Sequence, residues 1–564
     1  MEDKNHDKNV AEFIVDTLAN AGVQHLYGIT GDSLNALTDA ISKDGRIKFI
    51  HVRHEESAAF AASAEAQLTG KLAVCAGSSG PGHVHLVNGL YDANRTFAPV
   101  LAIASTCPSA MFGTEYFQET KPELLFENCS IYNQMAVSPA QVPVMFQNAM
   151  QQALSRGGVA VVAVPGDVNA MPVPSEAAAT PLITDRLPTP SKEEISKCAE
   201  IINNAGNITI FAGSGASKAA DKLSSLAERL KAPLITTFKS QLELTKDSPN
   251  YVGHIGYLGM WSATDALQRA DAIIVIGTNF PYSGLFPEGK KIIQVDVRPE
   301  NIGKRMTVNI GVRADAGLFI DAISPFIQEK TDRTHLDKAL ADYAEICNKM
   351  QEPVKHPGTV GSIRPEFVFD TLDRLADVDA IFTVDTGMNC LWSAHYLHPS
   401  KGRTMIGSFS HGSMANALPQ AIGASVTCPE RQVIALCGDG GLTMLMGDLL
   451  TIIQYRLPVK ILVADNRSLA FVKWEMELAG FKPSEVSLKN PDFGDMARSI
   501  GFDAQTIDNP EHLEEAMKHW LEATGPALLS VVTDDNAASF TFSHKLMDAS
   551  SPDNNVSNFM PPGI

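Results

Sequence analysis

The segment RQVIALCGDGGLTMLMGDLLTIIQYRLPVKILVADN, residues 431–466, identifies the fold class and holds a candidate binding site. Its two apolar runs, at 432–437 and 459–464, flank a stretch with a helical pattern, which is typical of buried parallel strands joined by a crossover helix. Asp439 follows the first run and Asn466 follows the second. Because one strand–helix–strand unit takes up the residues between them, we expect both side chains at the same edge of the sheet.

Asp439 and Asn466 are candidate ligands of a divalent cation, and a loop oxygen at Ser468 is a third. So few ligands do not enclose a metal, but they suit Mg²⁺ that is also bound by a diphosphate. Gly440 and Gly441 would let the backbone approach that diphosphate. A Gly-Asp-Gly sequence alone more often marks a simple turn, and the spacing and context favour the metal site here.

The strand-and-helix pattern recurs along the whole chain. Further apolar runs lie at 47–52, 72–76, 100–104, 159–164, 208–212, 233–237, 272–277, 291–296, 380–385 and 527–532. A Pro- and Ala-rich stretch at 171–190 and a Pro/Gly passage at 353–361 separate these runs into three groups. The sequence therefore predicts three α/β domains, each a doubly wound parallel sheet, at 1–175, 190–340 and 360–540, followed by a tail at 541–564.

Composition excludes several classes of protein. The 564 residues include 45 Lys and Arg against 64 Asp and Glu, a net charge of −19, and no basic stretch suggests a nucleic-acid partner. The eight cysteines form no CxxC pair, so we interpret them as buried small side chains in a reducing compartment. No apolar run could span a membrane and no signal sequence is evident, which predicts a cytoplasmic protein.

The Gly-Asp-Gly motif with Asn466 downstream resembles the signature of enzymes that bind thiamine diphosphate. Such an enzyme needs a carboxylate that hydrogen-bonds a ring nitrogen of the aminopyrimidine and so promotes deprotonation of the thiazolium carbon. Glu55, in RHEESAAFAA, is the candidate, because it follows a strand and begins an Ala-rich helix where burial would raise a carboxyl pKa. The alternative for such an acid is a simple interaction with the helix dipole, which we keep for Glu56.

Longer segments resemble the flavin-dependent pyruvate oxidase family, over nearly the whole chain to about residue 540. They are YGITGDSLNAL, GSSGPGHVHLVNGLYDA, EYFQE, GTNFPYS, QVDVRPENIGKR and GSFSHGSMANALPQAIGA. The resemblance implies that the N-terminal domain binds the thiamine pyrimidine, the middle domain binds FAD, and the C-terminal domain binds the diphosphate and Mg²⁺.

The resemblance also implies the contacts of each cofactor. Gly412, Ser413 and Met414 would touch the thiamine ring, with Met414 holding the cofactor in a bent conformation. The diphosphate side would be formed by Asp439, Gly440, Gly441, Asn466, Arg467, Ser468, Leu469, Ala470, Phe471 and Val472. The flavin contacts would be Ile255, Gly256, Tyr257, Leu258, Thr278, Asn279, Phe280, Pro281, Tyr282 and Asp296, the last a strand-end acid suited to ribose hydroxyls.

Four side chains are implied near the reaction centre, namely Phe117, Gln118, Phe471 and Glu475, with Glu475 in proton transfer. Without the motif, Phe117 and Phe471 would be taken for core aromatics. The implied reaction is oxidative decarboxylation of pyruvate to acetate or acetyl phosphate and CO₂. It proceeds through a hydroxyethyl-thiamine diphosphate enamine, and electrons pass to FAD and then to quinone or O₂. The implied assembly is a homo-oligomer, a tetramer, whose site lies between two subunits.

Three alternatives remain open at this point. An acetolactate synthase-type carboligase shares the thiamine motifs and also carries FAD without net redox change, although EYFQE and GTNFPYS favour the oxidase. A non-redox 2-oxo acid decarboxylase would lack flavin. A cofactor-binding scaffold without turnover is disfavoured by the presence of Glu55, Asp439 and Asn466 together.

The tail at 541–564 differs from the family pattern. Quinone-linked members end in an amphipathic, partly basic helix that docks on the membrane. Here Lys545 is the single Lys or Arg after Phe540, and Pro, Asn and Ser interrupt any helical face. We therefore do not expect membrane docking, and a peripheral position at the inner membrane face is the alternative.

Overall fold

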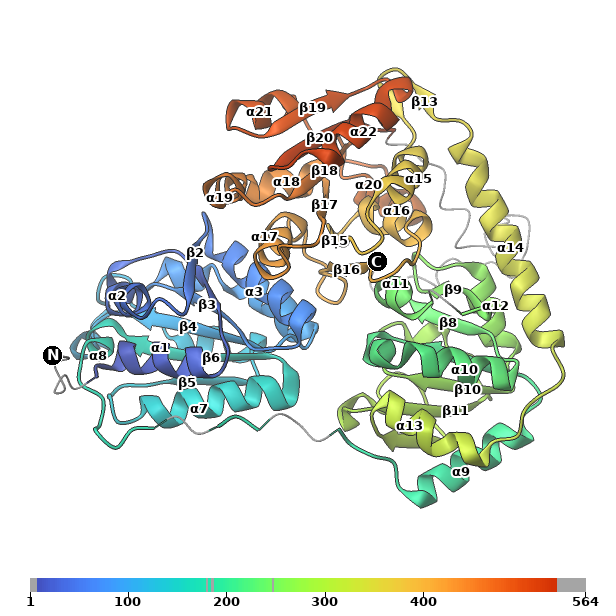
Figure 1. Cartoon of the computed structure of the whole chain (residues 1–564), viewed down its shortest axis with the longest axis horizontal. Coiled ribbons are helices and arrows are strands. Elements are labelled where there is room, and N and C mark those ends of the chain that lie inside the picture. The colour runs from blue at the N-terminus through green and yellow to red at the C-terminus, as the bar shows by residue number, and fades with distance from the viewer. Residues whose placement is uncertain (1–7, 179–180, 184–186, 246–247, 535–564) are drawn as a thin grey trace.

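The computed structural model describes residues 8–178, 181–183, 187–245 and 248–534, which form three α/β domains. In Figure 1 the N-terminal domain lies at the left, the middle domain at the right and the C-terminal domain above them. The predicted tail at 541–564, and the last residues of the predicted third domain, lie outside the described residues.

The N-terminal domain is built on a six-stranded parallel sheet with the strand order β2-β1-β3-β4-β6-β5. Its strands are β1 (His25–Gly28), β2 (Lys48–His51), β3 (Ala73–Gly77), β4 (Val100–Thr106), β5 (Tyr132–Met135) and β6 (Val159–Pro165). Its helices are α1 (Val10–Asn20), α2 (Asn35–Asp44), α3 (Glu55–Thr69), α4 (Pro81–Val84), α5 (Val87–Arg95), α6 (Pro122–Leu125), α7 (Val142–Gln152) and α8 (Gly166–Asn169). Asn9 and Glu12 form a capping box that begins α1.

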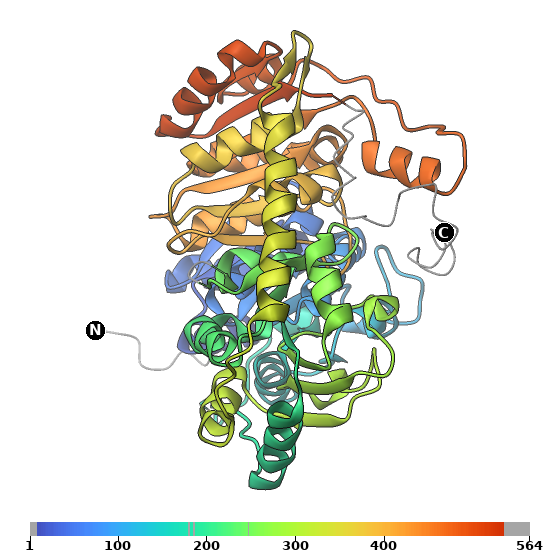
Figure 2. The same cartoon turned by 90° about the vertical axis from the view of Figure 1, so that its right-hand side faces the viewer.

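The middle domain has the same architecture, with the strand order β12-β11-β10-β7-β8-β9. Its strands are β7 (Ile208–Ala212), β8 (Leu234–Thr237), β9 (Tyr251–Ile255), β10 (Ala272–Ile276), β11 (Lys291–Asp296) and β12 (Ile310–Arg313). Its helices are α9 (Lys192–Asn204), α10 (Ala220–Leu230), α11 (Gln241–Leu244), α12 (Trp261–Arg269) and α13 (Ala316–Ile323). The long helix α14 (Thr334–Val354) then runs along the outside of the molecule to the C-terminal domain (Figure 2).

The C-terminal domain repeats the pattern with the strand order β16-β15-β17-β18-β20-β19, after a short antiparallel pair, β13 (Gly358–Thr359) and β14 (Ser362–Ile363). Its strands are β15 (Ile381–Val384), β16 (Thr404–Gly407), β17 (Val433–Gly438), β18 (Lys460–Asp465), β19 (Asp503–Ile507) and β20 (Ala527–Val532). Its helices are α15 (Pro365–Leu375), α16 (Met388–Tyr396), α17 (Ala417–Thr427), α18 (Asp439–Leu445), α19 (Leu449–Tyr455), α20 (Ala470–Leu478), α21 (Phe493–Ser499) and α22 (Leu513–Glu522).

The predicted fold class is confirmed, because each of the three sheets is entirely parallel and has helices on both faces. In each sheet the connections that leave two adjacent strands run in opposite directions at one central point: between β1 and β3, between β7 and β10, and between β15 and β17. Ligands of open parallel sheets bind at the carboxyl ends of the strands at such a switch point. The topology therefore indicates one candidate site per domain.

The N-terminal and C-terminal domains share a continuous apolar core through helices α3 and α17. Small residues let the two helices approach closely, since a Cβ on Gly423 would lie 2.2 Å from the carbonyl oxygen of Ala61. Close packing of this kind fixes the relative position of the two domains.

Two smaller expectations can be compared with the structure. The eight cysteines are free, but Cys347 and Cys428 are only partly buried, so the prediction that all are core residues was wrong for these two. None of the helices in the described part of the chain combines the length and the apolar character needed to cross a membrane.

Candidate functional site

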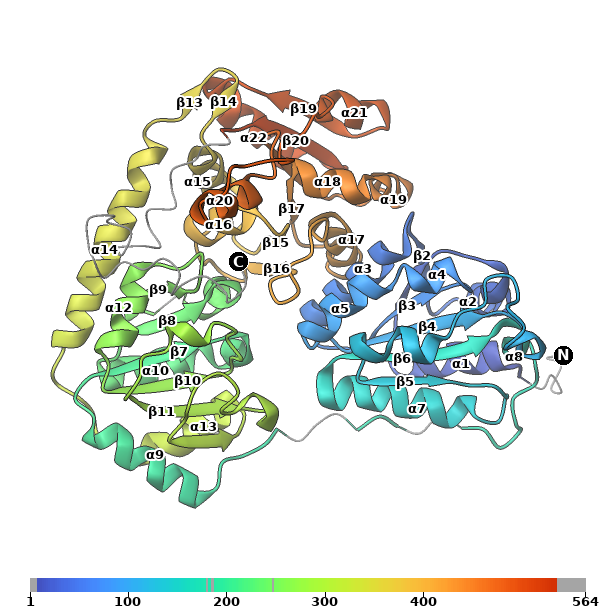
Figure 3. The same ribbon diagram turned by 180° about the vertical axis from the view of Figure 1, so that it is seen from behind.

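A cavity of about 540 Å³ lies between the middle and C-terminal domains. The middle domain contributes residues that follow β9 and β10, which are Ile255, Gly256, Tyr257, Leu258, Thr278, Asn279, Phe280, Pro281 and Tyr282. The C-terminal domain contributes Gly412, together with Phe471 and Glu475 from α20. Figure 3 shows α16 and α20 on the side of the C-terminal domain that faces the middle domain. The structure thus brings two separately predicted groups of residues into one cavity.

Aromatic side chains form one wall of this cavity. The ring centroids of Tyr257 and Tyr282 are 4.3 Å apart, and those of Phe280 and Tyr282 are 5.2 Å apart, both in edge-to-face arrangements. Edge-to-face packing holds the rings in defined orientations. Burial raises the pKa of Glu475, so this carboxyl retains a proton more readily than an exposed glutamate does.

Two buried histidines position the loop that carries Tyr257. The carbonyl oxygen of Leu258 accepts hydrogen bonds from Nε2 of His254, at 2.8 Å, and from Nε2 of His395, at 3.0 Å. Burial lowers the pKa of His254 to about 4 and that of His395 to about 3, so both rings are neutral at physiological pH. His395 belongs to α16, so the second bond joins the two domains at the cavity.

The predicted metal-binding residues lie at the ends of two adjacent strands. Gly438 of β17 is paired with Ala464 of β18, which places Asp439 and Asn466 just beyond the same edge of the sheet. The Asp439 side chain is 2% exposed, and Oδ1 of Asn466 accepts a hydrogen bond of 3.0 Å from the backbone N–H of Ser468. The register of β17 and β18 therefore agrees with the expectation that Asp439 and Asn466 lie at the same edge of the sheet.

Asn490 is a residue of this edge that the sequence analysis did not identify. Its Nδ2 donates to Oδ2 of Asp439 and to Oδ1 of Asp465, both at 2.7 Å. The pKa of Asp439 is raised to about 6, chiefly by burial and also by the nearby Asp465, whereas the hydrogen bond from Asn490 acts to lower it. Two buried carboxylates joined by one amide form a locus of negative charge that suits a divalent cation. An asparagine in an irregular loop carries no sequence signal that could have identified it.

Glycines form a cradle at the switch point of the C-terminal sheet. Gly387 follows β15 and Gly412 follows β16, and a Cβ on either residue would meet no atom within 4 Å. Both line the cavity and both have positive φ, of 137° and 81° respectively, which favours glycine. At Gly438 the nearest atom to such a Cβ would be 4.0 Å away. Exposed backbone from three adjacent strand ends is the feature that a diphosphate requires.

Asp385, at the end of β15, is a second residue that the sequence analysis did not identify, although an acid after an apolar run was a visible signal. Its Oδ1 accepts a hydrogen bond of 2.9 Å from the backbone N–H of Ala417. Its Oδ2 is buried and has no hydrogen-bond partner among the described residues. A Cβ on Gly441 would lie 2.2 Å from that oxygen, so glycine is required there. Burial raises the pKa of Asp385 to about 7.

The segment at 412–414 contacts both the N-terminal domain and the Gly-Asp-Gly loop. Ser413 Oγ accepts a hydrogen bond of 2.8 Å from Nδ2 of Asn88, which also donates to Oε1 of Glu56 at 2.6 Å. The Met414 side chain reaches the Gly-Asp-Gly loop, because a Cβ on Gly440 would lie 3.3 Å from its methyl carbon.

The remaining diphosphate-side residues lie in the loop after β18 and the start of α20. Arg467 has a φ of 56°, and its carbonyl accepts from the N–H of Leu488 at 2.8 Å. The N–H of Leu469 donates to the carbonyl of Val486 at 2.7 Å. Ala470 begins α20 and is buried, whereas the neighbouring Val472 is exposed.

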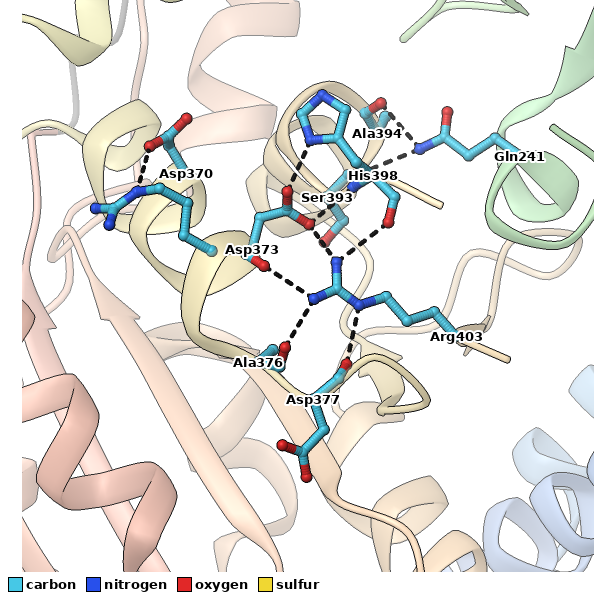
Figure 4. Close-up of polar contacts among 10 residues, drawn as sticks. Gln241, Asp370, Asp373, Ala376, Asp377, Ser393, Ala394, His398 and Arg403 are labelled. Carbon is cyan, nitrogen blue, oxygen red and sulfur yellow. Dashed lines mark hydrogen bonds and ion pairs between the residues drawn. The ribbon is translucent and has the colours of Figure 1, made fainter. Parts of the chain in front are cut away.

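A polar network holds the start of β16, which leads to this segment (Figure 4). Arg403 is 6% exposed and donates to the backbone carbonyls of Asp373, Ala376 and Asp377, each within 3.0 Å. It also donates to Oδ1 of Asp373 at 2.5 Å. The guanidinium therefore caps the C-terminal end of α15 and ties it to β16. In the same view Gln241 of the middle domain donates to the carbonyl of Ala394 at 2.9 Å.

The three predicted site residues of the N-terminal domain do not line this cavity. Glu55 begins α3, is 7% exposed, and its Oε2 lies 2.9 Å from Nδ1 of His85. Phe117 is 73% exposed. Oε1 of Gln118 accepts a hydrogen bond of 2.9 Å from Ser79 Oγ. Within one chain, these side chains are separate from Phe471 and Glu475.

Asp296 ends β11, the strand beside β10, so it lies at the same carboxyl edge of the middle sheet as Thr278 but does not line the cavity of about 540 Å³. Its Oδ1 accepts a hydrogen bond of 2.8 Å from the N–H of Arg298, and its Oδ2 accepts one of 3.2 Å from Asn301. Burial raises the pKa of Asp296. The next residues, Val297 and Arg298, line a second cavity of about 1070 Å³ where the three domains meet.

Comparison with known proteins follows the same three-domain division. Models of the thiamine pyrophosphate enzyme family match residues 8–124 as the N-terminal TPP binding domain, 195–323 as the central domain and 385–531 as the C-terminal TPP binding domain.

Several curated relatives align over most of the chain. The putative thiamine pyrophosphate-containing protein YdaP of Bacillus subtilis is 35% identical over 93% of this chain and 92% of its own length. The pyruvate oxidase of Lactiplantibacillus plantarum is 33% identical over 90% of this chain and 85% of its own length. A probable acetolactate synthase large subunit of Methanocaldococcus jannaschii is 32% identical over 93% and 92%. The chain therefore belongs to the thiamine pyrophosphate enzyme family.

Proposed function

We propose that this protein catalyses the flavin-dependent oxidative decarboxylation of pyruvate, with thiamine diphosphate, Mg²⁺ and FAD as cofactors. The observation that carries the proposal is the cavity of about 540 Å³, in which the GTNFPYS segment and residues 255–258 face Gly412, Phe471 and Glu475. A flavin ring against the aromatic wall would lie beside a thiamine ring held by the C-terminal domain. Electron transfer between two cofactors requires such proximity.

The residues at the switch point of the C-terminal sheet suit thiamine diphosphate and its metal. Asp439, Asn466 and an oxygen of Ser468 would bind Mg²⁺, and the backbone at Gly387, 438–441 and 466–472 would face the diphosphate. When bound, thiamine diphosphate supplies a carbon nucleophile for the keto group of pyruvate and an acceptor for the electron pair released with CO₂, and FAD accepts two electrons.

The chain's own side chains would orient these groups and move protons. Met414, held against Gly440, would support the bent form of the thiamine ring, with Gly412 and Ser413 beside it. Glu475 would transfer a proton, since burial raises its pKa towards the working range of a general acid. Phe471 would close the reaction space on the α20 side.

Glu55, Phe117 and Gln118 would reach the reaction centre of a second copy of the chain. Glu55 would hydrogen-bond the aminopyrimidine, for which its burial at the start of α3 is suitable. The 73% exposure of Phe117 is consistent with a side chain that is covered on assembly. A homodimer is then the smallest active unit and a homotetramer is the proposed assembly, and active monomers in sedimentation would contradict this.

The decisive experiment is an anaerobic reductive half-reaction. Pyruvate should bleach the absorbance of the bound flavin, and mixing the reduced enzyme with O₂ or a soluble quinone, with and without phosphate, then identifies the acceptor and the product, acetate or acetyl phosphate. A flavin that stays oxidised while acetolactate accumulates would assign the chain to the carboligases, as its 32% identity to an acetolactate synthase allows. Acetaldehyde from a flavin-free protein would assign it to the non-redox decarboxylases.

A substitution separates the role of Glu55 from cofactor binding. Glu55→Gln should abolish exchange of the thiazolium proton with solvent deuterium, because an amide cannot share a proton with the aminopyrimidine. Affinity for Mg²⁺ and thiamine diphosphate should stay within a few-fold of the wild-type value. Glu56→Gln is the matched control and should exchange at the normal rate. Normal exchange in Glu55→Gln would remove this acid from the mechanism.

A further inference from the structure

The two cavities described above adjoin each other. Among the described residues, Lys239 and Phe409 line both the cavity of about 540 Å³ and the one of about 1070 Å³. Lys239 follows β8, and Phe409 follows β16. A ligand that occupied both cavities would therefore pass these two side chains.

The joined cavities are rich in positive charge, although the protein has a net charge of −19. Seven Lys and Arg residues of the described chain line them, against three carboxylates. The cations are Arg95, Arg156, Lys218, Lys239, Arg298, Arg305 and Arg313, and the acids are Glu243, Glu300 and Glu475. A concave surface that concentrates one sign of charge attracts a ligand of the opposite sign.

The Lys239 ammonium group has no hydrogen-bond or ion-pair partner within the described part of the protein. Its side chain is partly buried and forms no hydrogen bond or ion pair there, and the nearby acids Asp92 and Glu243 act on it only at longer range. Burial lowers the pKa of this ammonium group, and the charges of Asp92 and Glu243 offset that effect only in part. A partly buried cation without a partner has lost part of its hydration, which destabilises the folded protein. An anionic ligand that paired with Lys239 would compensate this desolvation free energy.

We propose that Lys239 binds the diphosphate of the flavin dinucleotide at the point where the two cavities join. The inference rests on the proposed function, because it takes FAD as the ligand of both cavities. It adds a binding residue that lies outside the flavin-contact segments, at the boundary that the two cavities share. Inorganic phosphate is the other anion that could meet Lys239, and the experiment distinguishes the two.

The test uses full-length protein freed of flavin and titrated with FAD or with riboflavin, which has the ring but no phosphate. Lys239→Met should weaken FAD binding by about 10- to 100-fold, the loss expected for one charge-assisted hydrogen bond, and should leave riboflavin binding nearly unchanged. Lys239→Arg should retain most of the affinity for FAD. The affinity of the wild-type protein for FAD should also fall more steeply with salt than that of Lys239→Met.

Controls separate binding from folding. Lys197→Met removes an exposed, ion-paired lysine of the same domain and should not change FAD affinity. Lys239→Met without flavin should melt at or above the temperature of the wild-type protein, because an uncompensated charge has been removed.

Three outcomes would overturn the inference. One is an equal loss of FAD and riboflavin affinity, and another is no loss of either. The third is unchanged FAD affinity in Lys239→Met together with the loss of inorganic phosphate binding that the flavin-free wild-type protein shows. That result would assign Lys239 to free phosphate. A wild-type protein that binds no flavin at all would overturn the proposed function as well.

Discussion

Gly423→Ala tests the junction between the N-terminal and C-terminal domains. Gly423 lies within α17, where alanine would normally stabilise a helix by about 1 kcal/mol over glycine. Here the added Cβ would lie 2.2 Å from the carbonyl oxygen and 2.8 Å from the carbonyl carbon of Ala61 in α3. Both atoms belong to helix backbone, so the helices would have to separate by roughly 1 Å to restore normal contact.

Overpacking of this kind costs about 1–3 kcal/mol, and we expect the upper end because no flexible side chain can yield. After subtraction of the helix-propensity gain, the free energy of unfolding should fall by about 2 kcal/mol. Affinity for thiamine diphosphate should fall too, because α5 packs on α3 and would move with it. That movement strains the hydrogen bond of 2.8 Å between Asn88 of α5 and Ser413.

Urea unfolding followed by circular dichroism, together with calorimetric titration of thiamine diphosphate, measures both effects. Gly447→Ala is the matched control, because its Cβ would lie 3.8 Å from Arg53 at the contact between the same two domains, an ordinary distance. It should change stability by less than about 0.5 kcal/mol. Stability equal to or above that of the wild-type protein in Gly423→Ala would refute the packing argument.

Three further substitutions follow from the site and its supports. Arg403→Met should reduce the free energy of unfolding in urea by about 3 kcal/mol, because buried carbonyls at the end of α15 and the carboxylate of Asp373 lose their hydrogen-bond donor. Arg403→Lys should restore only part of the lost stability. An Arg403→Met protein as stable as the wild type would contradict the capping role. The hydrogen bond to Asp373 raises the pKa of His398, so its stabilisation is present below the unfolded-state pKa of about 6.5 and is lost as pH rises through the folded-state value. His398→Gln should accordingly destabilise more at pH 5.5 than at pH 8.5, and equal effects at the two pH values would exclude the ion pair. Asp439→Asn should weaken Mg²⁺-dependent binding of thiamine diphosphate at least about 10-fold in calorimetry, because the metal loses an anionic ligand, and unchanged affinity would exclude this carboxylate from the metal site.

Central strands could be predicted from the sequence because they are buried on both faces. β17 and β18 are nearly continuous apolar runs, and their structural bounds lie within a residue of the predicted ones. Strands such as β19, which is DAQTI, could not be predicted, because an edge strand is partly exposed and mixes polar with apolar residues. β1 was missed for another reason, since four residues are too few to show a period.

The residues of the candidate site also fall into those that local sequence could select and those that it could not. Asp439, Asn466 and the flavin segments follow apolar strands in recognisable motifs, so local sequence was sufficient to select them. Asn490 and Lys239 lie in irregular or short segments, and their proposed roles depend on neighbours distant in the chain. No local pattern reports such a role, because hydrogen-bond partners and cavity walls are set by packing.

The order of residues was enough to establish the fold class and the strand ends at which cofactors would be bound, because burial and backbone geometry act over a few residues at a time. The predicted flavin-contact segments lie in one cavity with Phe471 and Glu475 because of the way in which the middle and C-terminal domains pack. The separation of Glu55 and Phe117 from that cavity within one chain likewise depends on domain packing. These arrangements arise from contacts between segments hundreds of residues apart, such as α3 against α17, and steric fit between surfaces is not encoded in any local pattern.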